Sequence, residues 1–198
     1  MTRRKTFAGA FLSHVLPAVL ILMSGLTLPA LGQVSFPTRY AVVLAEAPVD
    51  LLEMERRLHF STPVANPQYQ VTTGEFAFHP GFPRLAAKID AILVRTSQIL
   101  NIQPSPQSRL NIVLVADGKE VRRRHLLIVP GQRQGLFGFG SLEAFYETYN
   151  RTIYLSLRDL HEGILAHEMA HDLLCTRVCP PLPASDQESW AHYVESRL

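Results

Sequence analysis

Apolar residues recur every third or fourth position in three parts of the chain, and this spacing is typical of helices that bury one face. The longest series predicts a helix from about Arg84 to Leu100, directly after Pro83, which interrupts the preceding secondary structure. A second series predicts a short helix capped by Asp50, and a third predicts a helix around Gly163–His171. The three series are Leu85, Ile89, Ile92, Leu93 and Ile99; Leu51, Met54 and Leu58; and Leu165, Met169 and Leu173.

The third helix also has a start signal. Asp159 can cap its first turn, and Glu162 stands three residues further on, which together make a capping box. A helix beginning near residue 159 places Gly163–His171 well inside a regular helical segment.

Other apolar runs are too short for helices and predict strands. The run Leu110–Val115 is apolar on both faces, apart from Asn111, which is typical of a central strand. Ala144–Tyr149 and Thr152–Leu157 predict a hairpin across the two residues Asn150-Arg151. Further strands are predicted at Tyr40–Leu44, Tyr69–Phe78 and Leu126–Val129.

This mixture of elements predicts an α+β fold for a single domain over residues 33–198, with a small mixed sheet that packs on the helix around Gly163–His171. Residues 33–39 are expected to form a linker. A short basic helix is expected after Asp117-Gly118, and Gly131–Gly140 is expected to form a loop near a cleft.

The first 32 residues have the features of an export signal. Arg3, Arg4 and Lys5 make a basic start, Val15–Leu28 is mostly apolar, and Ala30-Leu31-Gly32 offers small residues for cleavage. Cleavage there would give a secreted or periplasmic protein. An uncleaved membrane anchor is the alternative, because the apolar stretch is nearly long enough to span a bilayer.

The formal net charge of +2 is set by this leader, which carries three basic residues and no acidic one. Without residues 1–32 the chain has 16 basic and 17 acidic residues, a balance of −1. A chain without an excess of positive charge gives no indication of a nucleic-acid partner.

The chain contains two cysteines, Cys175 and Cys179. In an exported protein, two cysteines four positions apart predict one small disulfide. A metal site that includes cysteine is the alternative, although a better metal-binding pattern lies nearby.

That pattern is His167-Glu168-Met169-Ala170-His171. Histidines four positions apart lie on one face of a helix, so their two imidazoles can reach a single metal ion. Glu168 projects beside the pair, where a carboxylate can take a proton from a water activated by the metal. The alternative is a helix that carries two ordinary histidines, in a structural envelope protein without metal.

A catalytic zinc site needs a third protein ligand, and the last predicted helix offers the candidates. Ser185 or Asp186 is expected to cap this helix, which is expected to run through Arg197. Glu188 is the favoured ligand, and the alternatives are His192, Asp186 and Glu195.

With His-Glu-Met-Ala-His and then Glu188-Ser189-Trp190-Ala191-His192-Tyr193, the chain resembles the gluzincin zinc metallopeptidases, and most closely the thermolysin and aminopeptidase-like group. Glu188 falls on the glutamate of the second gluzincin motif. The resemblance implies a zincin-like fold, one Zn²⁺ ion held by His167, His171 and Glu188, and Glu168 as the general base of peptide hydrolysis. It also implies that the strand Thr152–Leu157 is the edge strand lining the cleft for a peptide or protein substrate.

The chain departs from the gluzincin pattern at two positions. Ser189 replaces a glycine, and His192 stands where several gluzincins have an acidic residue that orients a metal histidine. The chain is also expected to lack the family's larger C-terminal lobe, so a transition-state-stabilising group is expected to come from Tyr193, Tyr154 or Tyr149, each of which ordinary packing also explains. These departures leave a second interpretation open, a catalytically inactive zinc-binding module that binds a peptide or an envelope partner.

Overall fold

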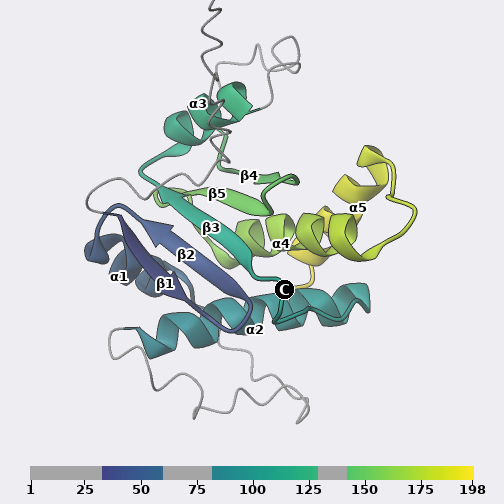
Figure 1. Ribbon diagram of the computed structural model, residues 1–198, viewed down its shortest axis with the longest axis horizontal. Helices are drawn as coiled ribbons and strands as arrows, with labels where there is room; N and C mark the ends of the chain where they lie inside the picture. Colours follow the sequence, from purple (N-terminus) through teal and green to yellow (C-terminus); the bar gives the residue numbers. More distant parts are fainter. Residues whose placement is uncertain (1–32, 60–81, 129–141) are drawn as a thin grey trace, which may run out of the picture.

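The structure is a computed structural model that describes residues 33–59, 82–128 and 142–198 (Figure 1). These ranges contain five helices and one five-stranded mixed sheet, which confirms the predicted α+β class. The predicted signal peptide, the predicted strand Tyr69–Phe78 and the glycine-rich segment Gly131–Gly140 lie outside the described residues. In the described ranges, no helix combines the length and apolar character needed to cross a membrane.

The sheet has the strand order β1-β2-β3-β5-β4. Its three inner strands are parallel to one another, and the outer strands β1 and β4 each run antiparallel to their neighbour. The strands are β1 (Val34–Pro37), β2 (Ala41–Ala45), β3 (Leu110–Val115), β5 (Thr152–Ser156) and β4 (Ala144–Glu147).

The central position of β3 confirms the prediction from its apolar run. Because successive side chains of a strand point to opposite faces, Ile112 and Leu114 enter the larger core, whereas Val113 and Val115 enter a smaller cluster on the other face. A strand with apolar residues at both sets of positions therefore holds the two halves of the molecule together.

Helices cover both faces of the sheet, and one face carries most of them (Figure 1). The larger core unites this face with α1 (Pro48–Arg57), α2 (Pro83–Leu100), α4 (Glu162–Arg177) and α5 (Ala184–Glu195). The opposite face is covered by α3 (Gly118–Ile128), through Val121. The apolar series that predicted α1, α2 and α4 supplies buried residues of the larger core, including Leu51, Ile89 and Met169.

Three local predictions are wrong. The expected linker over residues 33–39 contains β1, whose Phe36 is buried and packs edge-on against Phe82. The expected strand Leu126–Val129 is the last turn of α3 as far as Ile128, because the basic helix continues through these apolar residues. The hairpin is confirmed, but four residues (148–151) connect its strands instead of two, and Arg151 adopts a left-handed backbone with φ of 50°.

Asp50 stabilises the start of α1 from inside the first turn and not from the cap position. The cap residue is Ala47, and the Asp50 carboxylate accepts a hydrogen bond from the Ala47 backbone N–H at 2.9 Å. The predicted helix was therefore placed two to three residues late at its start.

Candidate metal centre

Helix α4 carries the His-Glu-x-x-His pattern across the larger core, with Leu165, Met169 and Leu173 buried as their spacing predicts. Its cap residue is His161, whose Nδ1 accepts a hydrogen bond from the Ile164 backbone N–H at 3.3 Å. The predicted capping box is wrong.

Both residues of the predicted capping box have other partners. The Asp159 carboxylate accepts a 2.6 Å hydrogen bond from the Ser156 hydroxyl, and Glu162 accepts one from the backbone N–H of His59. Helix α4 consequently begins two residues later than its sequence suggested, and Glu162 ties its first turn to the end of α1.

Helix α5 lies along α4 and brings the third candidate ligand to the histidines. Its buried residues Ala191 and Val194 pack into the larger core, which turns the side of α5 with Glu188 towards α4. Pro183 is the cap residue, so the helix begins two or three residues earlier than the predicted cap at Ser185 or Asp186 implies, and it ends at Glu195.

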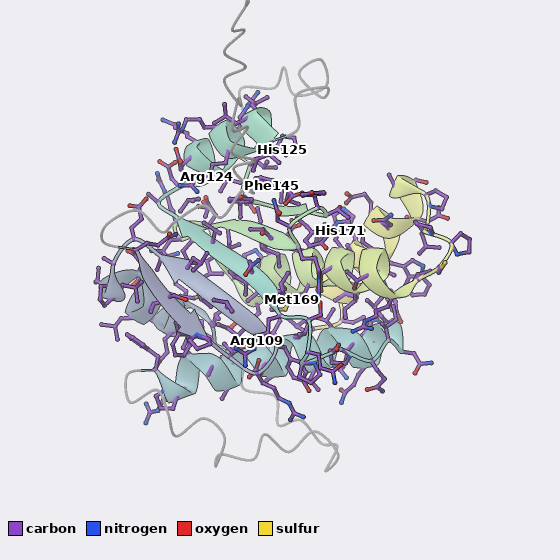
Figure 2. The ribbon with its side chains drawn as sticks, in the orientation of Figure 1. Arg109, Arg124, His125, Phe145, Met169 and His171 are labelled. Atoms are coloured by element: carbon purple, nitrogen blue, oxygen red, sulfur yellow. The ribbon has the colours of Figure 1, made fainter. Side chains whose placement is uncertain are left out.

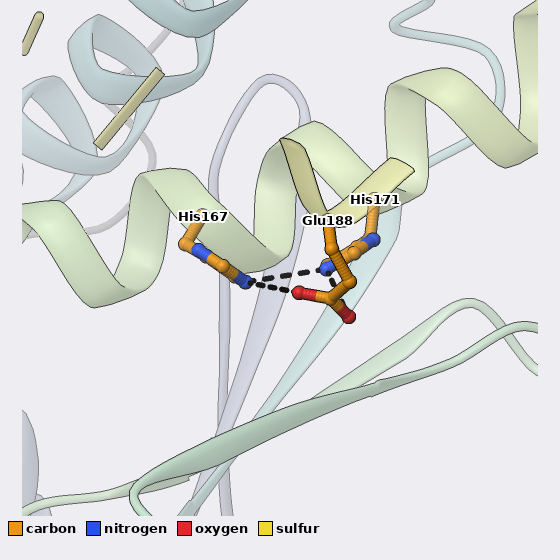
Figure 3. Close-up of side chains that lie close together, drawn as sticks. All are labelled: His167, His171 and Glu188. Atoms are coloured by element: carbon orange, nitrogen blue, oxygen red, sulfur yellow. Dashed lines mark hydrogen bonds and ion pairs between the residues drawn. The ribbon is translucent and has the colours of Figure 1, made fainter. Parts of the chain in front are cut away.

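His167, His171 and Glu188 converge on one point (Figure 3). The two Nε2 atoms are 3.3 Å apart, and each lies 3.5 Å from one oxygen of the Glu188 carboxylate. Ligands about 2.0–2.1 Å from a tetrahedral zinc ion are separated from one another by about 3.3 Å. The three donors therefore fit a single zinc ion with little rearrangement.

The chemical state of the donors also suits a metal. Burial lowers the pKa of His171, against the opposing influence of the Glu188 charge, so the imidazole keeps a free lone pair at neutral pH. The Glu188 side chain is 58% exposed, whereas the His167 and His171 side chains are mostly buried. The group is thus open to solvent on the side of Glu188, as a site that must admit a substrate requires.

Glu168 lies beside the group and is 8% exposed. Burial raises the pKa of its carboxyl to about 8, and the charges of Glu188 and Glu195 act in the same direction, while a hydrogen bond from the Tyr146 backbone N–H opposes them. A neighbouring cation would favour the ionised form of Glu168. The carboxyl is therefore poised to change its protonation state when a metal binds.

The edge strand beside the group is β4, and the assignment of this role to Thr152–Leu157 is wrong. Strand β5 lies inside the sheet, between β3 and β4. The Ser156 backbone N–H bonds to the Glu143 carbonyl, and bonding alternates along an antiparallel pair, so the main-chain groups of Ala144 and Tyr146 point away from β5. Among the described residues no further strand pairs with this edge, which lies on the side of the candidate metal-binding group. The Tyr146 N–H donates to Glu168, so the groups directed outward without that contact are those of Ala144 and the Tyr146 carbonyl.

A buried network joins this edge strand to α4. Asp172, which is 2% exposed, accepts a 3.0 Å hydrogen bond from the Tyr146 hydroxyl. Arg151 binds the same carboxylate with two nitrogens, at 2.9 and 2.8 Å. The sequence predicts Arg151 only as a residue of the hairpin turn. The signal for this network is Asp172, an acidic residue directly after His171 in a helix that buries an apolar face, because a buried carboxylate needs a cationic partner.

A cavity of about 530 Å³ extends from the metal-binding group along β4. Figure 2 shows His125 of α3 and Phe145 of β4 next to each other, and their rings, which both line this cavity, meet edge-on at 4.9 Å. Sequence reasoning missed both His125 and Tyr146 as lining residues, because they come from elements far from the motif. The lining residues are His125, Leu142, Ala144, Phe145, Tyr146, Thr148, His167, Glu168, His171, Cys175, Ala184, Gln187, Glu188 and His192.

The three tyrosines considered from the sequence lie elsewhere. Tyr149 is 92% exposed in the hairpin turn, and Tyr193 packs edge-on against Trp190. Tyr154 stacks on Phe145 in the smaller cluster. None of the three is among the cavity-lining residues; Tyr154 and Tyr193 pack against other rings, and Tyr149 is exposed to solvent.

A second group of donors shares His167 with the first. This second group consists of His167, His192 and Glu195. His167 Nδ1 lies 3.3 Å from Glu195 Oε2, and His192 Nδ1 lies 3.4 Å from the same oxygen. The structure thus places His192 and Glu195 behind His167, and Asp186 belongs to neither group of donors.

The predicted disulfide is wrong, because Cys175 and Cys179 are free. Helix α4 continues to Arg177, which holds Cys175 on the helix surface, where its thiol donates to the Gln187 side-chain oxygen at 3.2 Å. Cys179 lies beyond the helix end and is exposed. Cys175 therefore contacts α5 and not the following turn.

Comparison of the chain with protein-family models, with curated proteins and with solved structures found no match.

Proposed function

We propose that the protein is an exported zinc-dependent peptidase of the gluzincin type, with a zincin-like domain over residues 33–198. The observation that carries the proposal is the convergence of His167 Nε2, His171 Nε2 and the Glu188 carboxylate, in which the two nitrogens are 3.3 Å apart and each lies 3.5 Å from a different Glu188 oxygen. Export rests on the leader in residues 1–32, and zinc is favoured because two imidazoles and one carboxylate are a common set of ligands for catalytic zinc.

In this proposal Glu168 moves the proton. A zinc ion held by the three ligands would supply Lewis acidity for activating water and polarising a peptide carbonyl. Glu168, ionised next to the cation, accepts the proton released during attack and delivers it to the leaving amine. Its buried position between α4 and β4 keeps bulk water away from this transfer.

The outer edge of β4 would hold the substrate. An extended peptide can pair with the outward main-chain groups of Ala144 and with the Tyr146 carbonyl, and so add a strand to the sheet, while the Tyr146 N–H stays on Glu168. The cavity between β4 and the metal-binding group would receive its side chains. The substrate class is accordingly peptides or proteins in an extended conformation.

Two substitutions test the proposal. We expect Glu168→Gln to keep zinc and to lower peptide hydrolysis by about 10²-fold or more, since general base catalysis contributes about 10² to 10⁴. His171→Ala should lose both zinc and activity. The measurements are metal content of the purified mature protein and cleavage of a mixed peptide library, with and without a chelator. Equal hydrolysis by Glu168→Gln and the wild type would contradict the role of Glu168.

One observation favours a second function, a zinc-binding module that binds peptides without cleaving them. Without a metal ion, the pKa of about 8 keeps the Glu168 carboxyl largely protonated at pH 7, and a carboxyl that kept this proton beside bound zinc could not act as a base. In this case wild type and Glu168→Gln would both bind zinc and retain peptides from the library, and neither would cleave them.

A further inference from the structure

His167 belongs to both groups of metal donors, and a neutral imidazole cannot serve both. Its Nε2 faces His171 and Glu188, while its Nδ1 faces Glu195. A neutral ring carries a proton on one nitrogen and a lone pair on the other. The position of that proton therefore decides which group can bind a metal ion.

We propose that Glu195 is a positioning residue that holds the proton of His167 on Nδ1 and so directs the lone pair of Nε2 to the metal. This inference rests on the proposed zinc site. An ionised carboxylate can only accept a hydrogen bond, so Glu195 Oε2, 3.3 Å from Nδ1, requires an N–H there. Histidine ligands generally donate their second nitrogen in this way, which fixes the ring and strengthens the ligand.

The packing of α4 leaves room for this contact at Gly163. A Cβ at residue 163 would lie 3.2 Å from Glu195 Cγ and 3.1 Å from the His161 ring, closer than ordinary packing. Gly163 is four residues before His167, on the same face of α4. The absent side chain thus lets Glu195 lie flat across the first turn of α4 and reach His167.

Gln187 makes the equivalent contact with His171, by a side-chain hydrogen bond. Because His171 Nε2 faces His167 and Glu188, Nδ1 is the nitrogen left to donate. The Gln187 amide is held with its nitrogen on the Leu182 carbonyl at 2.8 Å and its oxygen towards α4, where it accepts from the Cys175 thiol. Helix α5 thus supplies one ligand, Glu188, and one acceptor for each histidine.

It follows that the second group of donors is not a second metal site. Glu195 accepts from His167 on one side, and His192 lies 3.4 Å from the same oxygen on the other. With Nδ1 protonated, this group has lost one of its three donors, so of the two donor groups in the described residues only one binds an ion.

The experiment measures zinc affinity by competition with a chromogenic chelator. We expect Glu195→Ala to weaken zinc binding about 10- to 100-fold, the usual effect of losing such a partner. Glu195→Gln should lose less, because its amide oxygen can still accept from Nδ1. Asp186→Asn removes a carboxylate from the same helix outside both donor groups and is the matched control, with the affinity of the wild type. His192→Ala should also bind one zinc ion with nearly unchanged affinity.

A spectroscopic readout separates positioning from general damage. In ¹⁵N–¹H spectra of the metal-free protein at pH 8, His167 should carry its proton on Nδ1, and Glu195→Ala should show a mixture of tautomers. Unchanged affinity and an unchanged tautomer in Glu195→Ala would overturn the inference, as would two zinc ions per wild-type chain. Failure of the wild type to bind zinc would instead overturn the proposed function on which the inference rests.

Discussion

At the scale of single residues, burial has the largest effect on the pKa of Asp90 on α2. Its carboxylate accepts hydrogen bonds from the Thr38 hydroxyl at 2.7 Å and from the backbone N–H groups of Arg39 and Tyr40. These donors lower its pKa, but burial outweighs them and raises the pKa above the usual 3.8. The contact joins α2 to the turn between β1 and β2.

The sign of this shift gives a prediction for stability. The folded state holds the Asp90 proton more tightly than the unfolded chain, so the contribution of this group is fully present below about pH 4 and is lost as the pH rises through the folded-state pKa. Each unit of difference between the two pKa values corresponds to about 1.4 kcal/mol. Asp90→Asn has no such proton, so its stability relative to the wild type should improve from pH 4 to pH 7. Urea unfolding at several pH values checks this, and a difference that does not vary with pH would contradict it.

At the scale of elements, the alignment of β4 with α4 depends on Arg151. Its guanidinium binds Asp172 and also donates to the Ser108 carbonyl at 2.8 Å, so one side chain joins the hairpin turn, α4 and the loop before β3. Asp172 is nearly fully buried, whereas Arg151 is 22% exposed. The ion pair therefore holds the edge strand in place next to the metal-binding group.

We expect Arg151→Gln to lower the free energy of unfolding by about 3–5 kcal/mol, since it leaves a buried carboxylate without its cation. Arg123→Gln is the matched control, because the ion pair of Arg123 with Glu120 is exposed to solvent and should contribute little to stability. Chemical denaturation of both variants measures the contrast. An equal decrease in the free energy of unfolding of the two variants would mean that the Arg151–Asp172 pair stabilises the fold no more than an exposed ion pair does.

At the scale of the whole molecule, the metal-binding group joins α4 to α5. His167 and His171 belong to α4, while Glu188 belongs to α5. Unfolding would separate these ligands, so bound zinc should stabilise the folded chain. At a free zinc concentration 1,000 times the dissociation constant, the gain is about 4 kcal/mol.

Removing the metal should therefore lower the melting temperature of the wild type. The same chelator should leave the melting temperature of His171→Ala unchanged, because this variant has already lost the site. Thermal unfolding followed by circular dichroism, with and without chelator, gives both values. A chelator that shifts both proteins equally would place its effect outside the three ligands.

Local patterns predicted the elements that bury a continuous apolar stripe. The helix after Pro83, the central strand Leu110–Val115 and the helix with Leu165 and Met169 all follow from spacing within one segment. Strand β1 was missed because it has only four residues, and its stability comes from pairing with β2. A segment so short carries little pattern of its own.

The residues of the candidate site also fall into those that a local motif predicted and those that only the fold brings together. His167, Glu168 and His171 are visible as one motif, and the position of Glu188 was expected from a second motif. The proximity of Tyr146, His125 and Arg151 depends on strand order and packing between distant segments, which spacing along the chain does not encode. The disulfide was wrongly expected because the sequence did not show that α4 continues past Cys175.

Under the proposed function, the outer edge of β4 has a consequence for the choice of substrate. Pairing through amide and carbonyl groups reads the shape of a backbone, whatever side chains it bears. Peptides of very different composition would then be accepted alike, provided that they can extend. A proline, or an N-methylated residue, opposite Ala144 or Tyr146 would remove a donor from the ladder and be refused.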